Sequence, residues 1–155
     1  MTEAGEAIIS LHPKFANAIL AGTKTVELRR RIPPIKIGTR LWIYATQPIG
    51  AVIGTVTVEA IVRATPDVIW DTCADRADVS RLEFDRYFSG ASKAIGISLR
   101  GAQKIEAIEI EKLRSWRVGF HPPQVMLKIA ANEAKSLLRL VSNAAKLDRA
   151  AGGRA

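Results

Sequence analysis

Cysteine and histidine are scarce in this sequence of 155 residues, which contains one cysteine and two histidines. Cys73 has no second cysteine to pair with, so no disulfide can form within the chain and a reducing, cytoplasmic environment is expected. We expect Cys73 to be a small core residue rather than a nucleophile. One cysteine with His12 and His121 supplies too few ligands for a tetrahedral zinc site, and no metal is expected.

Long apolar runs and the common nucleotide-binding loops are also missing. No apolar run approaches the length of a membrane span, and the short apolar stretch 7–11 lacks the basic residues that precede a signal-peptide core. Neither a GxGxxG pattern nor a P-loop is present, and no cofactor is expected. Each histidine precedes a proline and is expected to be structural, so any catalysis must rely mainly on Lys, Glu, Arg, Tyr and water.

Acidic residues are too few to balance the basic ones. Lys and Arg number 23 and Asp and Glu number 15, which gives a net charge of +8. This excess attracts polyanions, with nucleic acid as the first candidate and no membrane partner expected. Part of the charge is concentrated in one short region, which contains Lys24, Arg29, Arg30, Arg31, Lys36 and Arg40.

One eight-residue segment, Gly-Thr-Lys-Thr-Val-Glu-Leu-Arg, combines a strand pattern with an unusual arrangement of charge. Val26 and Leu28 alternate with Glu27 and Arg29, which is the period of a half-buried strand whose apolar pair faces a core. The opposite face presents a carboxylate and a guanidinium, with the ammonium of Lys24 at the start of the strand. From this pattern alone, a solvated face with a weak ion pair is an equally good interpretation.

The remaining pattern predicts an α+β fold, a small closed or nearly closed β-barrel with flanking helices. Strands are expected at 7–11, 25–29, 41–45, 51–63, 95–99, 105–110 and 125–129. Helices are expected at 13–21, at 66–73 and at about 80–88. Gly22 is expected to end the first helix, and Ser80 or Asp78 to cap the third. Gly54 indicates a bulge or a sharp bend within the longest strand.

A C-terminal helix is predicted from Asn132 onward, because apolar residues recur on one face at Ala134, Leu137, Leu138, Val141 and Ala145. We therefore divide the chain into a barrel domain, 1–131, and a C-terminal amphipathic helix with a disordered tail, 132–155. The apolar face is expected to pack on the barrel, with a partner protein as the alternative. The oligomeric state stays open.

The spacing Gly22-x-Lys24-x-x-Glu27-x-Arg29 resembles the GxKxxExR signature of the ASCH domain, a branch of the PUA-like superfamily. Further segments resemble small bacterial stand-alone members, in the order Ser10-Leu11-His12-Pro13-Lys14, Trp42-Ile43-Tyr44-Ala45-Thr46, Gly54, Phe84 to Gly90 with Tyr87-Phe88, and Pro122-Pro123-Gln124. The resemblance covers about 8–129. It implies a PUA-like β-barrel with a helix over a cleft, in which Glu27 and Arg29 face the cleft while Val26 and Leu28 pack the barrel.

The resemblance also implies action on RNA, as a binding module or as an enzyme. Some small bacterial members that this chain resembles are ribonucleases, and others are amidohydrolases of acetylated cytidine. The amidohydrolases pair the signature lysine with a threonine three positions later and with a distant glutamate. This sequence has Glu27 at the threonine position and a loose match, Glu83, for the distant acid, so it departs from the amidohydrolase pattern.

We predict RNA or nucleotide-base binding through a basic cleft lined by the GxKxxExR motif. Lys14, Arg29, Arg30 and Tyr44 are the expected binding residues, with Tyr44 stacking on a base. Trp42 is expected in the core, and the two aromatic rings are taken to point in opposite directions from their strand.

Hydrolysis of RNA or of a modified nucleoside is the alternative function. Lys24 and Glu27 would then form the acid–base pair, and Arg29 would stabilise developing negative charge. Nearby cations are expected to lower the pKa of Lys24. A regulatory or interaction protein without catalysis is the second alternative.

Overall fold

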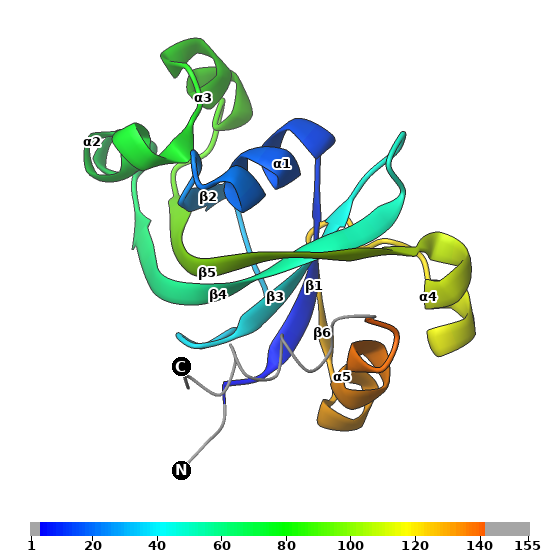
Figure 1. The fold of residues 1–155 in the computed structure, drawn as a ribbon. Helices are drawn as coiled ribbons and strands as arrows, with labels where there is room; N and C mark the ends of the chain where they lie inside the picture. Colours follow the sequence, from blue (N-terminus) through cyan, green and yellow to red (C-terminus); the bar gives the residue numbers. More distant parts are fainter. Residues whose placement is uncertain (1–3, 142–155) are drawn as a thin grey trace.

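The computed structural model describes residues 4–141, which form one curved sheet with helices packed around it (Figure 1). Within these residues the strands are β1 (Glu6–Leu11), β2 (Val26–Arg29), β3 (Arg40–Ala45), β4 (Ala51–Ala64), β5 (Ala94–Glu109) and β6 (Met126–Ile129). The helices are α1 (Pro13–Ala21), α2 (Pro66–Ala77), α3 (Arg81–Tyr87), α4 (Ile110–Trp116) and α5 (Ala131–Leu138). The predicted α+β class is confirmed.

The strands form a six-stranded sheet in the order β2-β5-β4-β3-β1-β6. β1 and β3 pair in parallel, and the other neighbouring strands are antiparallel. In the part of the chain that is described, no ladder joins the edge strands β2 and β6, so the sheet is barrel-like but open. The prediction allowed a closed or a nearly closed barrel, and the fully closed form is wrong. The sheet has an open seam along the edge strand β2.

The long strands β4 and β5 bend across the sheet and carry its curvature. Their register shifts between Val52 and Gly54, which confirms the predicted irregularity. A Cβ atom on Gly54 would lie 2.5 Å from Leu20 and 2.7 Å from the carbonyl oxygen of Gln103, so this close approach requires glycine. The strands expected at 95–99 and 105–110 are one strand, because Gly101 turns the chain with φ +66° without ending the ladder.

Apolar side chains gather in three groups. The central core lies between the sheet and α1 and contains Ala7, Ile9, Leu11, Ala16, Ile19, Leu41, Ile43, Ala45, Val56, Val58, Ile95, Ile97 and Leu99. The aromatic core lies under α4 and α5 and includes Ile8, Trp42, Tyr44, Ile108, Leu113, Phe120 and Leu137. The helical core lies under α2 and α3 and contains Val26, Leu28, Ile69, Cys73, Ala77, Phe84, Phe88 and Ala94.

The helical core corrects one expectation about β2. Val26 and Leu28 pack under α2 and α3 rather than inside the barrel, because β2 is an edge strand and those helices cover its apolar face. Cys73 is 1% exposed in the same core, and burial raises the pKa of its thiol, in agreement with the prediction of a core cysteine.

Local sequence signals set most of the helix ends. Gly22 ends α1 with φ +85°, and its N–H donates to carbonyl oxygens of the last turn. Thr65 caps α2, and Ser80 caps α3 in a reciprocal capping box with Glu83. None of the helices in the described part of the chain is long and apolar enough to cross a membrane.

The C-terminal helix α5 packs on the sheet of its own chain. Ala134 and Leu137 are buried in the aromatic core, as predicted for the apolar face; Val141 is buried there too, but the helix ends at Leu138, earlier than predicted. Ala145 and the predicted disordered tail lie outside the described residues, and the division of the chain at 131 stays a prediction. Helix α4 was not predicted, because its seven residues carry too short an apolar pattern to mark a helix.

A candidate nucleic-acid site in the open seam of the sheet

The seam between β1 and β2 holds a pocket of about 250 Å³. It forms because the partner strand β6 covers β1 from Glu6 to Ile9 and leaves the end of β1 without a neighbour on that side. The pocket, here called the seam pocket, is lined by Ser10, Leu11, His12, Phe15, Lys24, Glu27, Leu28, Arg29, Val79, Glu83, Phe84 and Tyr87. Among the described residues, the buried charged side chains are Lys24, Glu27 and Arg29, and all three line this pocket.

Glu27 lies between the two cations of the motif. Its Oε2 accepts a hydrogen bond of 2.8 Å from Nε of Arg29, and its Oε1 lies 4.0 Å from Nζ of Lys24. Arg29 also donates from Nη2 to the carbonyl oxygen of Ser10 at 2.8 Å, so its side chain crosses the seam from β2 to β1. The buried cluster therefore has two cations against one carboxylate, and this net positive charge favours an anionic ligand.

Lys24 is almost fully buried, with 2% of its surface exposed, and its neighbours are polar and aromatic groups. Its Nζ donates a hydrogen bond to the carbonyl oxygen of Ala77 and lies 5.0 Å from the ring centre of Phe15. Burial is the main cause that lowers the pKa of Lys24; Arg29 lowers it further, while Glu27 opposes the shift. Such an ammonium gives up its proton more readily than an exposed lysine does. The predicted effect of a neighbouring cation is present but smaller than that of burial.

Aromatic rings and one unsatisfied hydroxyl form the rest of the pocket wall. Phe15, Phe84 and Tyr87 come from α1 and α3, and Tyr87 is 43% exposed. Burial raises the pKa of the Tyr87 phenol, which therefore stays protonated at neutral pH. Ser10 Oγ is buried and has no hydrogen-bond partner among the described residues. Because an unpaired buried hydroxyl is costly, a ligand that supplies its partner gains affinity.

An ion pair links α1 to α3 at the edge of the seam pocket. Nζ of Lys14 lies 3.3 Å from Oε2 of Glu83, and both side chains are exposed. Hydrogen bonds from the Ser80 backbone, and then from Lys14, lower the pKa of Glu83, so this carboxylate stays ionised at neutral pH. Lys14 thus reaches the site through Glu83, which lines the pocket. His12, expected to be structural, is exposed and lines the pocket as well.

Tyr44 does not reach the seam pocket. Residues two apart in a strand share a face, so Tyr44 and Trp42 both point into the aromatic core, and the expectation of opposite directions was wrong. Tyr44 is 2% exposed and packs edge-on against Phe120 with 6.4 Å between ring centres. Tyr87 instead supplies a partly exposed tyrosine at the site.

Arg30 lies outside the seam pocket, beside Tyr87. Its Nη1 donates to the carbonyl oxygens of Tyr87 and Ser89 at 2.9 and 3.2 Å. These bonds fix its guanidinium against the end of α3. The structure therefore brings together Lys24, Glu27, Arg29 and Glu83, places Arg30 and Lys14 next to them, and separates Tyr44.

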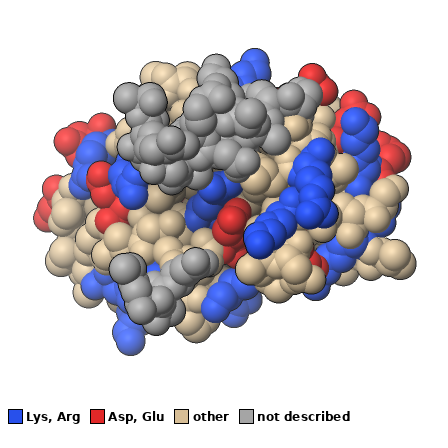
Figure 2. Space-filling model, turned by 60° about the horizontal axis from the view of Figure 1, so that its bottom comes forward, with Lys and Arg blue, Asp and Glu red and all other residues tan. Residues whose placement is uncertain are grey.

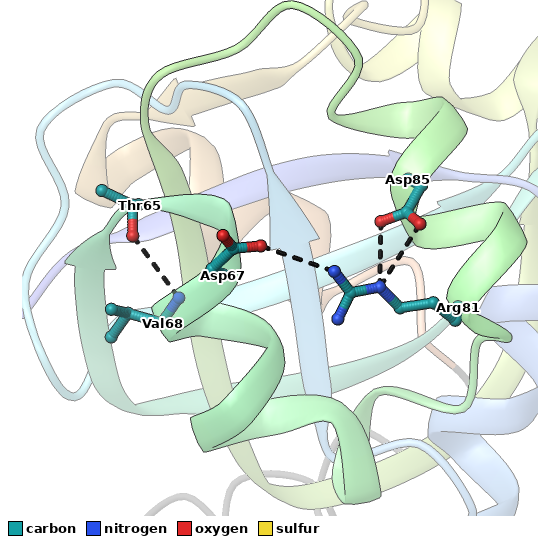
Figure 3. A network of polar contacts seen from close by, with 5 residues as sticks. All are labelled: Thr65, Asp67, Val68, Arg81 and Asp85. Atoms are coloured by element: carbon teal, nitrogen blue, oxygen red, sulfur yellow. Dashed lines mark hydrogen bonds and ion pairs between the residues drawn. The ribbon is translucent and has the colours of Figure 1, made fainter.

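Helix α3, which carries one wall of the pocket, is tied to α2 by Arg81 (Figure 3). Arg81 Nε donates to both carboxylate oxygens of Asp85, at 3.1 and 3.3 Å. Its Nη2 donates to Asp67 of α2 at 3.4 Å, and its guanidinium lies 5.0 Å from the ring centre of Trp70. The two helices are thereby held together over the helical core, with Tyr87 in the last turn of α3 facing the pocket.

Sequence reasoning did not name several residues of the site, among them Ser10, Phe15 and Tyr87. Ser10 and Tyr87 stand in segments that carry the family resemblance, which was the available signal. Phe15 lies in the helix predicted at 13–21, and nothing in the local pattern distinguishes a ring in the core from a ring in a pocket wall. All three become site residues through the curvature of the sheet.

A cleft that a helix borders and that holds Lys24, Glu27 and Arg29 is the arrangement that the resemblance to ASCH domains led us to expect. The ASCH domain family model matches residues 9–122. The chain belongs to the ASCH domain family.

Two similar proteins from the bacterium Zymomonas mobilis match most of the chain. The chain is 42% identical, over 137 residues, to a protein named ASCH domain-containing ribonuclease, covering 88% of this chain and 93% of the relative. A crystal structure of ASCH from the same species has 41% identity and a TM-score of 0.86, covering 89% of this chain and 96% of that chain. These similarities agree with the predicted family and fold.

A more distant comparison shows the fold alone. The structure of human THYN1 protein in complex with DNA containing 5-methylcytosine matches with a TM-score of 0.56 and 10% identity. The match covers 88% of this chain and 97% of that chain. The same architecture therefore occurs at very low sequence identity.

Proposed function

We propose that this protein binds single-stranded RNA and cleaves it, with one unstacked nucleotide in the seam pocket. The observation that carries the proposal is the Lys24–Glu27–Arg29 cluster, buried in a pocket of about 250 Å³ with aromatic walls. Single-stranded RNA presents splayed bases that stack on aromatic side chains, whereas paired bases are not accessible in this way. The name of the Zymomonas mobilis relative, a ribonuclease, supports the same conclusion.

The pocket residues would supply an acid, a base and a cation for RNA cleavage in which the ribose 2′-hydroxyl attacks the adjacent phosphate. Glu27 accepts the proton of the 2′-hydroxyl while that oxygen attacks phosphorus. The bond from phosphorus to the 5′-oxygen breaks, and the Lys24 ammonium gives its proton to the leaving oxygen. Arg29 stabilises the additional negative charge on the phosphoryl oxygens. The products are a 2′,3′-cyclic phosphate and a 5′-hydroxyl, and a proton passing from Glu27 to Lys24 restores the starting state.

Two further residues would hold the base. The phenol ring of Tyr87 would stack on the base, an interaction of about 1–3 kcal/mol per base. Ser10 Oγ, buried without a partner in the described part of the chain, would hydrogen-bond an edge of the base. The motif residues would therefore act on the backbone while Ser10 and Tyr87 orient the base.

A second candidate function is hydrolysis of an acyl group from a modified nucleoside. The observation that favours it is the size of the pocket, which suits a single nucleoside and lies just below the usual range for small-molecule sites. The same acid and base would serve, with water as the attacking group. The two candidates differ in their products and in whether a strand is needed.

The test compares wild type with Lys24→Met, Glu27→Gln and the control Lys104→Met, all shown to be folded by circular dichroism. Lys104 is an exposed lysine on β5, outside the lining of the seam pocket. Single-stranded RNA, duplex RNA and acylated nucleosides are incubated with each protein, and products are identified by mass spectrometry. We expect cyclic-phosphate products from single-stranded RNA, with rates about 10²–10⁴-fold lower in the two pocket variants. Equal rates in Glu27→Gln and Lys104→Met would overturn the proposal, and deacylated nucleoside as the sole product would establish the second candidate.

A further inference from the structure

We propose that a groove beside the seam pocket binds the phosphate of the neighbouring nucleotide of an RNA strand. The groove, here called the arginine groove, is lined by Arg29, Arg30, Arg31, Tyr87, Gln124 and Val125. This inference rests on the proposed function, because it takes single-stranded RNA as the ligand. It adds a second subsite and implies that the substrate is a strand rather than a free nucleoside.

The arginine groove continues from the seam pocket. Arg29 and Tyr87 line both, so a chain that enters the pocket passes these two side chains on its way to the groove. The groove measures about 470 Å³ and lies between the residues after β2 and the residues before β6. It therefore lies between the segments that adjoin the two edge strands of the open sheet, and it continues the seam beyond the pocket.

The charge of the groove is positive and is not neutralised by its own lining. None of its lining residues is acidic. Arg31 is exposed and has no hydrogen bond or ion pair with the other described residues. Arg40, Arg76, Arg81 and Arg117 differ from it, since each lies within 4.0 Å of a carboxylate oxygen. An arginine without an acidic partner, at the rim of a nucleotide-sized pocket, is suited to a phosphate.

Arg30 is oriented for the same purpose. Its Nη1 is held by the carbonyl oxygens of Tyr87 and Ser89, and among the described residues its other nitrogens have no partner. Such anchoring lowers the entropy lost when the guanidinium binds a ligand.

The face drawn in Figure 2 carries charge of both signs. On the face drawn in Figure 2, lysine and arginine side chains lie in separate groups with acidic side chains between several of them. Overall charge alone therefore does not define one continuous docking surface on that face. The arginine groove is distinguished by three consecutive arginines, by the lack of acidic lining residues and by continuity with the pocket.

The experiment measures binding of a fluorescent 2′-fluoro RNA hexamer, which cannot be cleaved through a 2′-hydroxyl. Wild type and Arg31→Ala are compared with the control Arg114→Ala, in which an exposed arginine on α4 is removed far from α3 (Figure 1). Affinities are measured at several salt concentrations. We expect Arg31→Ala to bind about 3–10-fold more weakly and to reduce the slope of log affinity against log salt by about 0.7, the value for one phosphate contact.

Cleavage kinetics separate this inference from the proposed function. With ordinary RNA, Arg31→Ala is expected to raise KM while leaving kcat near that of wild type, because Arg31 is outside the pocket that holds the reacting groups. Arg31→Ala that matches Arg114→Ala in affinity and salt slope would overturn the phosphate subsite while leaving RNA cleavage intact. Wild type that binds the hexamer but does not cleave RNA would instead overturn the proposed reaction and keep the subsite. Absence of RNA binding by wild type would overturn both.

Discussion

The seam pocket and the aromatic core both bury aromatic rings against the same sheet, but their polar groups are treated in opposite ways. In the aromatic core the indole nitrogen of Trp42 donates to Glu6 Oε1 at 2.7 Å, and that of Trp116 donates to the carbonyl oxygen of Glu133 at 2.9 Å. No lysine, arginine or carboxylate among the described residues is buried there. In the seam pocket, Phe15 and Phe84 adjoin three buried charges and a hydroxyl without a partner.

This difference separates packing from function. Buried charges cost desolvation free energy that their mutual attraction does not reliably recover, so a cluster of them contributes little to stability. Residues that depart from the rules of stable packing are expected at functional sites. The aromatic core follows those rules more closely than the seam pocket, although Arg117 at the end of α4 beside it also has a buried Nη1 without a hydrogen-bond partner among the described residues. We therefore assign stability to the first region and ligand binding to the second, and the following predictions test that division.

The largest effect on stability is expected in the aromatic core. Phe120 is 4% exposed and contacts the rings of Tyr44 and Trp116 edge-on. Phe120→Ala should lower the free energy of unfolding by about 3–5 kcal/mol, because it removes buried surface and leaves a cavity. Urea unfolding measures this change, and RNA cleavage per folded molecule should stay unchanged. A folded variant that has lost its activity would break the division between the two regions.

The next effect concerns the buried ammonium of Lys24, compared with Lys24→Met. Burial lowers the folded pKa of Lys24, so between that pKa and the unfolded value of about 10.4 the unfolded chain binds more protons. The stability of wild type relative to the variant should therefore rise with pH across this window and level off above it. Urea unfolding at several pH values measures the difference. A difference that is constant, or that falls as pH rises, contradicts the cost assigned to this buried charge.

The smallest effect is expected from removing the unpaired hydroxyl of Ser10. Ser10→Ala should leave stability unchanged or slightly higher, because the Oγ has no hydrogen-bond partner among the described residues. If Ser10 bonds the base, the variant should raise KM for RNA about 5–10-fold, the value of one hydrogen bond of about 1–1.4 kcal/mol. Unfolding and cleavage are measured on the same preparation. Loss of stability without a change in KM would make Ser10 a structural residue.

The site could be predicted in part because its central residues are adjacent in sequence. Alternation along one strand places Glu27 and Arg29 on one face, and the structure has them hydrogen-bonded there at 2.8 Å. Ser10 and Tyr87 lie on other elements, and they reach the pocket through the curl of the sheet and the placement of α3. Tyr44 was assigned to the cleft as a nearby aromatic residue taken to point away from Trp42, whereas residues two apart in a strand share a face and Tyr44 lies in the aromatic core with Trp42.

The fold shows the same limit. Strand periods and helix caps are local, so the α+β class and the caps at Gly22 and Ser80 follow from the sequence. Closure of the sheet depends on whether two edge strands meet, and local pattern carries no information about that. Two separate strands were predicted at 95–99 and 105–110, although the ladder between β4 and β5 continues on both sides of the turn at Gly101.

The central claim is that the seam pocket receives a nucleotide of an RNA strand, and a crystal structure with a 2′-fluoro RNA trinucleotide tests it most directly. We predict one base between Phe15 and Tyr87, within hydrogen-bond distance of Ser10 Oγ, and a phosphate next to Arg29. A strand bound on another surface, with the seam pocket left empty, would contradict the account.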